Sequence, residues 1–233
     1  MSVPRHIVAI GGGVLMPDGA NVKLERYTLD ASGKEKPRVA FVPTASGDDP
    51  IYIARFYETY GRLGVPVDVL RFFRRTPADL RAYLFEFDVV HVGGGNTRSM
   101  LAVWRHYGFD AVLREAWERG IVLCGSSAGS LCWFAAGVTD SIAGELTTTG
   151  GLGFVAGSNC PHYDGEVERR PAYHRLVASG MLAAGIACDD GAAVHVTGDG
   201  VVRVVAALPN ARAYRVECDA DGVREDALDT RAL

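Results

Sequence analysis

The 233-residue chain lacks the features that mark several common classes of protein. Its charge is nearly balanced, with 24 lysines and arginines against 28 aspartates and glutamates, so no nucleic-acid or anionic-membrane partner is indicated. No apolar run approaches the roughly 20 residues that span a bilayer. Residues 1–13 hold one short apolar stretch that ends in three glycines, which is unlike a signal peptide. We therefore expect a soluble, cytoplasmic protein.

Cysteine is also scarce. An odd number of cysteines spread through a chain of this length does not indicate a disulfide framework. None of them forms a CxxC pair, so a zinc ribbon is not predicted and we expect no metal site. The five are Cys124, Cys132, Cys160, Cys188 and Cys218.

Short apolar runs alternate with segments of helical spacing. The runs show no inside/outside alternation, which is typical of strands buried on both faces of a parallel sheet. The predicted strands are 6–10, 38–42, 65–70, 88–92 and 121–124, and the predicted helices are 51–63, 97–107 and 109–119. This order predicts an α/β fold with a mostly parallel sheet flanked by helices.

The pattern changes after about residue 185. The runs 192–196 and 201–207 flank Gly198-Asp199-Gly200, which is a hairpin signal, and 213–217 is predicted to be a further strand. We expect these segments to form an antiparallel edge at the C-terminal end of the sheet. The chain has no internal repeat or low-complexity linker, so residues 1–233 are predicted to form a single domain.

The sharpest motif is Gly125-Ser-Ser-Ala-Gly129. An apolar strand precedes this GxSxG sequence and an apolar, helix-compatible stretch follows it, which is the context of a nucleophile elbow. The flanking glycines allow a sharp turn that lifts Ser127 above the sheet. A small strand-to-helix turn without chemistry is the alternative; the context favours a nucleophile.

A serine nucleophile needs a base, and the base needs an orienting group. His162 follows Pro161 in a loop-like segment downstream of the serine, and we predict that it is the base. The contexts of the other histidines favour structural or solvated roles; they are His6, His91, His106, His174 and His195.

The orienting carboxylate is less clearly marked. Asp189 and Asp190 lie at a break between strands, where carboxylates are costly unless they are exposed or used. Asp140 is the rival. We rank Asp190 first and Asp140 second, with turn capping as the alternative role for both.

Acyl transfer also requires hydrogen-bond donors for the oxyanion. The Ala128 N–H directly after the nucleophile supplies one, and the glycine run 93–95 can bring a second backbone N–H close. Neither this run nor 11–13 satisfies GxGxxG or leads to a Walker lysine. Nucleotide binding is therefore not predicted, and no cofactor is expected.

Four motifs in this order resemble the peptidase E family of serine peptidases, which is grouped with cyanophycinases and shares the class I glutamine amidotransferase-like fold. They are Val92-Gly-Gly-Gly-Asn-Thr97, Gly125-Ser-Ser-Ala-Gly129, Cys160-Pro-His-Tyr163 and Asp189-Asp-Gly191. The resemblance covers about residues 6 to 216. It implies a cytoplasmic, aspartyl dipeptidase-like hydrolase.

By this resemblance Ser127 is the nucleophile and His162 the base, while Ala128 and Gly94 (or Gly95) are the oxyanion donors. Asp190 falls where the family places an acid before glycine, but that acid is a glutamate in peptidase E proper. The arginine-containing stretch after the histidine also differs here. Arg169 or Arg170 is a candidate for binding an acidic side chain or a peptide carboxylate, against the alternative of an exposed, charged helix start.

Several other functions are weighed against a serine dipeptidase. A cyanophycinase-like hydrolase and a non-catalytic peptide-binding relative stay open. A glutamine amidotransferase is less favoured, because those enzymes use cysteine where Ser127 stands, and Cys124 lies inside the preceding strand. An α/β-hydrolase esterase usually has a longer chain and a histidine near its C-terminus. A pocket closed by a partner subunit is compatible with the sequence, so a homodimer is left open.

Overall fold

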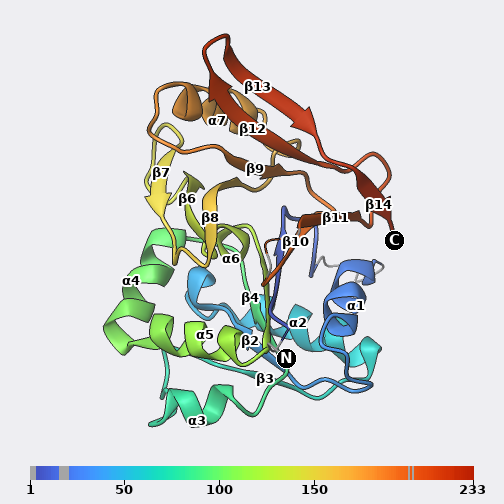
Figure 1. The fold of residues 1–233 in the computed structure, drawn as a ribbon. Helices are drawn as coiled ribbons and strands as arrows, with labels where there is room; N and C mark the ends of the chain where they lie inside the picture. The colour runs from blue at the N-terminus through green and yellow to red at the C-terminus, as the bar shows by residue number, and fades with distance from the viewer. Residues whose placement is uncertain (1–3, 16–20, 199, 201) are drawn as a thin grey trace.

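The computed structural model describes residues 4–15, 21–198, 200 and 202–233. Its main feature is an eight-stranded sheet of order β14-β11-β10-β1-β5-β4-β2-β3 (Figure 1). The five strands from β1 to β3 in that order pair in parallel, and β10 pairs antiparallel with both β1 and β11. The strands are β1 (His6–Ile10), β2 (Val39–Val42), β3 (Val67–Val69), β4 (Val89–Val92), β5 (Val122–Ser126), β10 (Ala192–Thr197), β11 (Val202–Ala206) and β14 (Thr230–Ala232).

A second sheet has six strands in the order β13-β12-β9-β8-β6-β7. Strands β6, β8 and β9 are parallel, and the strands outside them pair antiparallel. The strands are β6 (Phe134–Thr139), β7 (Thr147–Gly150), β8 (Val155–Cys160), β9 (Gly185–Cys188), β12 (Ala213–Asp219) and β13 (Gly222–Ala227).

Helices cover both faces of the eight-stranded sheet. Helices α4 (Thr97–Tyr107) and α5 (Phe109–Glu118) pack on one face, while α1 (Lys23–Asp30) and α2 (Pro50–Leu63) pack on the other (Figure 1). Helix α7 (Arg169–Ala178) packs on the second sheet. The remaining helical segments are η1 (Thr44–Ser46), α3 (Leu80–Leu84) and α6 (Ala128–Leu131). Among the described residues, no helix is long and apolar enough to cross a membrane.

Most of the apolar runs of the sequence correspond to strands buried on both faces. The run 65–70 does not, because it holds only the short edge strand β3, in which Asp68 is exposed and both valines are half-buried. In β1, Ile7 and Ala9 belong to the core under α4 and α5, and Val8 and Ile10 belong to the core under α1 and α2. All four side chains are fully buried. A run in which successive side chains enter two different cores has no polar face, which explains the missing alternation.

The second half of the chain differs in part from the expectation. Strands β10 and β11 form the predicted antiparallel edge, but β12 belongs to the second sheet and not to the edge of the first. Of the predicted hairpin, Asp199 and Val201 lie outside the described residues. The helix after Ser127 has a single turn, and Phe134 already begins β6. The polar, glycine-containing strands β7 and β8 carry little apolar signal, so the sequence did not indicate the second sheet.

Candidate active site

Ser127 stands at the turn between β5 and α6. Its backbone has φ 57° and ψ −115°, a strained conformation for a residue with a side chain. An added Cβ at Gly125 would lie 2.5 Å from the carbonyl oxygen of Gly129, and one at Gly129 would lie 2.2 Å from that of Val92. Within residues 121–130, all of which are described, Ser127 alone is not buried. The turn therefore has the geometry of a nucleophile elbow.

His162 follows β8 and forms a hydrogen bond with Asp190. Its Nδ1 lies 2.7 Å from Oδ1 of Asp190, which stands in the link between β9 and β10. Because an ionised carboxylate only accepts hydrogen bonds, Nδ1 is the donor and Nε2 is the nitrogen with a free lone pair. The backbone of His162 has φ 54°, and its N–H donates to the carbonyl of Gly11. The first sheet thus helps to hold a histidine that the second sheet supplies.

The three candidate carboxylates have different surroundings. Asp190 contacts the histidine, whereas Asp140 lies 3.5 Å from the guanidinium of Arg169. Asp189 is buried, accepts the N–H of Arg212 with Oδ2, and has no partner for Oδ1 among the described residues. Burial raises the pKa of Asp189 to about 6. Of the three, Asp190 is placed to orient the base.

Two glycines allow the histidine–aspartate pair to approach the backbone. A Cβ added at Gly12 would lie 2.1 Å from Oδ1 of Asp190 and 2.5 Å from Cε1 of His162. One added at Gly165 would lie 2.6 Å from Oδ2 of the same aspartate. Sequence reasoning missed both positions. The available signal was the glycine run 11–13 directly after a predicted strand, which was considered only as a nucleotide loop.

The predicted oxyanion donors both lie close to Ser127. The N–H of Ala128 is the first of α6, so it has no acceptor within the helix. Gly94 faces the nucleophile, because an added Cβ there would lie 3.2 Å from Cβ of Ser127. However, the N–H of Gly94 donates to the hydroxyl of Tyr52 at 3.2 Å. The next amide of this loop, that of Gly95, is therefore the better candidate for the second donor.

Tyr52 is a contact that sequence reasoning missed, because it lies on α2, far from every motif in the chain. Its hydroxyl accepts the N–H of Gly94 and also shares a hydrogen bond with the side chain of Ser126. Burial raises the pKa of Tyr52, so the hydroxyl keeps its proton at neutral pH. The side chain therefore ties the glycine loop after β4 to the residue that precedes the nucleophile.

The two predicted substrate-binding arginines have protein partners. The guanidinium of Arg169 is buried and contacts Glu166 at 2.7 Å and the carbonyl of Val138 at 3.3 Å. Arg170 lies over the ring of Tyr163 and 3.3 Å from Glu225. Arg169 is therefore a buried side chain with internal partners, and not the exposed charged residue at a helix start that was the alternative. Arg170 is the more accessible of the two.

The other candidate nucleophile and two of the other histidines lie in buried surroundings. Burial raises the pKa of the Cys124 thiol well above its usual range, which opposes formation of a thiolate. Burial lowers the pKa of His91 to about 4, and this ring contacts the hydroxyl of Tyr60. The pKa of His195 is also lowered to about 4 by burial. Both rings are therefore neutral at pH 7, as structural histidines are.

Comparison with solved structures shows related folds. A peptidase from an acI-B1 actinobacterium superimposes with a TM-score of 0.71 over 97% of this chain and 94% of its own, at 18% identity. A putative peptidase E protein from Listeria monocytogenes EGD-e superimposes with a TM-score of 0.62 over 88% of this chain and 98% of its own, at 19% identity. The α/β fold with its mostly parallel main sheet is thus shared with peptidases.

Sequence comparison supplies the assignment. The chain is 46% identical over 229 residues to the uncharacterized peptidase YgaJ of Bacillus subtilis (strain 168), and the match covers 98% of this chain and 99% of the relative. The family model "Peptidase family S51" matches residues 7–204, a span that includes the elbow, the histidine and its aspartate. The chain therefore belongs to peptidase family S51 and is a peptidase.

Proposed function

We propose that the protein is a serine peptidase that hydrolyses dipeptides or short peptides through an acyl-enzyme on Ser127. His162 is the general base and acid, and Asp190 orients its imidazole. The N–H groups of Ala128 and Gly95 hold the oxyanion, with Gly94 shaping the loop. The observation that carries the proposal is the 2.7 Å contact between His162 and Asp190, together with a serine at a strained elbow.

Each step of the proposed reaction uses one of these groups. The Ser127 hydroxyl attacks the peptide carbonyl carbon while Nε2 of His162 takes its proton. The oxyanion of the tetrahedral intermediate accepts the two backbone N–H groups. His162 then gives the proton to the leaving amine, and the amine departs. Water attacks the acyl-enzyme with the same imidazole as base, which releases the acid and restores the serine.

The substrate class is the less constrained part of the proposal. Family membership supports a peptide substrate, and the resemblance to peptidase E makes an N-terminal aspartate the first side chain to test. Arg169 offers no free guanidinium for that aspartate, because Glu166 and Val138 already occupy it. Arg170 remains available only by exchanging its contact with Glu225. We therefore propose short peptides in general, with Asp-Xaa as one candidate.

Hydrolysis of a dipeptide panel tests the proposal. The panel contains Asp-Xaa, Glu-Xaa, neutral and arginine-containing dipeptides, and release of free amino acid is measured for the wild type, Ser127→Ala and Ser179→Ala. Ser179 is an exposed serine at the C-terminal end of α7, so its variant controls for the loss of a hydroxyl. We expect turnover by the wild type and the control, and none by Ser127→Ala.

Other results would change the assignment. Turnover of a β-aspartyl-arginine polymer in place of dipeptides would indicate the cyanophycinase-like alternative. Peptide binding without any turnover would indicate a binding relative and would overturn the proposal. Turnover that survives Ser127→Ala would remove the serine from the mechanism.

Three further points belong to the proposal. Residues 1–233 form one domain, which is supported by a core cluster that joins β9 and β12 of the second sheet to β10 and β11 of the first. The protein works in the cytoplasm, a reducing compartment that suits five free cysteines. The sequence leaves a homodimer open, and light scattering after gel filtration tests whether two copies of the chain associate.

A further inference from the structure

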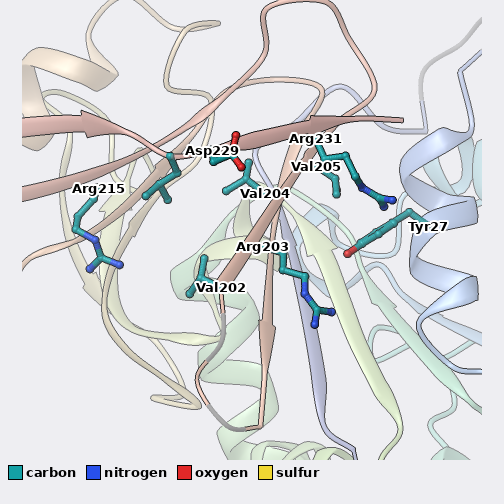
Figure 2. A pocket seen from close by; sticks show the side chains of 9 residues that line it. Tyr27, Val202, Arg203, Val204, Val205, Arg215, Asp229 and Arg231 are labelled. Carbon is teal, nitrogen blue, oxygen red and sulfur yellow. The ribbon is translucent and has the colours of Figure 1, made fainter.

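A cavity of about 690 Å³ lies away from Ser127, where β11 and β14 meet α1 and β12 (Figure 2). Its volume falls within the range of small-molecule sites, about 300–1,000 Å³. In the sheet order β11-β10-β1-β5, three strand spacings separate it from the strand that carries the elbow. At about 4.8 Å per spacing, the cavity lies roughly 14 Å to the side of the nucleophile strand.

The cavity has a strongly positive lining. Arg203, Arg215 and Arg231 all contribute to it, and Asp229 is its one carboxylate among the described residues. None of the three arginines forms an ion pair with a carboxylate of the described part of the chain. The protein as a whole carries a net charge of −4. Three guanidinium groups against one carboxylate in the cavity lining therefore create a local potential that favours an anion.

The charged groups are divided between two sides of the cavity. Figure 2 shows Arg203 and Arg231 on the side of Tyr27, and Arg215 on the opposite side. The guanidinium of Arg231 lies 5.7 Å from the centre of the Tyr27 ring. Both Arg203 and Arg231 act electrostatically on the ionisation of the Tyr27 hydroxyl, so both lie near it. Two guanidinium groups beside the phenol together supply several hydrogen-bond donors for an acidic group.

Apolar side chains line the space between these groups. Val202, Val204 and Leu228 contribute to the lining, and Val204 is buried. Hydrophobic side chains with a few convergent polar groups are the usual composition of a ligand site. A simple inorganic anion would leave this apolar surface in contact with water, so an anion that carries hydrocarbon fits the cavity better.

The Tyr27 hydroxyl is held by a chain of two histidines. It lies 2.7 Å from Nδ1 of His195, whose Nε2 lies 2.9 Å from Nδ1 of His6. Burial lowers the pKa of His195 to about 4, so the ring is neutral at pH 7. Neither histidine belongs to the proposed catalytic groups. The chain of contacts gives the cavity a hydrogen-bonded polar wall that contains none of the proposed catalytic groups.

We propose that this cavity is a second binding site, separate from the peptidase centre, and that it takes a small organic anion: a carboxylate or phosphate group on an apolar body. The acidic group binds between Arg203, Arg231 and Tyr27. The hydrocarbon covers the valines of β11 and Leu228, and Arg215 lies at the far side.

Titration of the isotope-labelled full chain tests the site by NMR. The probes are hexanoate, hexyl phosphate, inorganic phosphate and hexan-1-ol at constant ionic strength. We expect saturable shifts of the amides of residues 202–205 and 228–231 with hexanoate or hexyl phosphate, and at least tenfold weaker effects of inorganic phosphate and hexanol. The stronger of the two organic anions identifies the acidic group. Equal binding of hexanol would show an apolar pocket without anion selectivity and would overturn the proposal.

Two variants and a matched control locate the binding. Arg203→Gln and Arg231→Gln each remove a cation from the cavity, and each is expected to weaken the organic anion about tenfold. Arg26→Gln removes an exposed arginine from α1 that does not line the cavity, and it should bind as the wild type does. All three should keep peptidase activity.

Three outcomes contradict the site. Shifts confined to residues near Ser127 would show that the anion binds the peptidase centre. Unchanged affinity in both cavity variants, in chains whose spectra remain folded, would show that the arginines do not bind it. Finally, a concentration-dependent loss of the signals of residues 202–205 without any probe would show that a second copy of the chain covers the cavity.

Discussion

The proposed nucleophile and the proposed base are supported in different ways. Ser127 follows a strand buried on both faces, and its turn is held by backbone-to-backbone packing at Gly125 and Gly129. His162 follows β8 of the second sheet and is held by one carboxylate and by the carbonyl of Gly11. The first arrangement depends on the absence of side chains, and the second depends on single polar contacts. The base side should therefore be the easier one to disturb without unfolding the protein.

The largest effect is expected when the polar contact of the base is removed. Asp190→Asn keeps the shape but no longer fixes Nδ1 of His162 as the donor, so kcat should fall about 10³–10⁴-fold. Steady-state hydrolysis of the best dipeptide measures it. Asp140→Asn is the matched control, because that aspartate contacts Arg169 and not the histidine, and its kcat should stay within about twofold. A larger loss in the control would assign the orienting role to Asp140.

A steric change on the base side should have the next largest effect. In Gly12→Ala the new methyl group would collide with Oδ1 of Asp190 and with the imidazole of His162. A displacement of about 1 Å costs on the order of 10²-fold in rate. Gly61→Ala in α2 has open space around its Cβ, and it should keep full activity and gain about 0.5–1 kcal/mol of stability. Wild-type activity in Gly12→Ala would show that His162 and Asp190 are not held against the backbone at Gly12.

A smaller effect is expected on the nucleophile side. Tyr52→Phe removes the hydroxyl that accepts the N–H of Gly94 and contacts Ser126. Because this tyrosine positions the oxyanion loop without contacting substrate, kcat should fall about tenfold with KM unchanged. Tyr57→Phe, at an exposed position of the same helix, should behave as the wild type. A rise in KM with unchanged kcat would instead place Tyr52 in substrate binding.

The smallest effect concerns stability. The pKa of Asp189 is raised to about 6 in the folded protein, above its ordinary value of about 4. The folded state therefore favours the protonated form, and the stability from this group is present below pH 4 and is lost as the pH rises through 6. The free energy of unfolding of Asp189→Asn, measured relative to that of the wild type, should therefore rise by about 1–2 kcal/mol between pH 4.5 and pH 7.5.

Urea unfolding at the two pH values measures this difference. Asp221→Asn, at an exposed aspartate, is the matched control for the loss of one carboxylate. A wild type that gains stability relative to Asp189→Asn as the pH rises would show that the carboxylate is stabilised in its ionised form.

The same contrast explains what the sequence could predict. The central strands of the main sheet are nearly continuous apolar runs because both of their faces are buried, so 6–10, 88–92 and 121–124 were found from the sequence. The second sheet contains strands such as β7, Thr147–Gly150, with no apolar residue, and its pairing depends on contacts distant in the sequence. The elbow is a local motif and was therefore recognisable. The contacts of Gly12, Gly165 and Tyr52 exist only after separate segments meet, so no local pattern marked them.

The order of these segments along the chain has a consequence for biosynthesis. The proposed nucleophile, Ser127, leaves the ribosome before His162, and Asp190 follows last, at the link that joins the two sheets. Translation proceeds at roughly 5–20 residues per second, so the serine is exposed to the cell for seconds before its base and acid exist. During that time the nascent chain holds an unactivated hydroxyl and no peptidase. The order of the proposed catalytic groups along the chain thus delays activity until Asp190 has been synthesised.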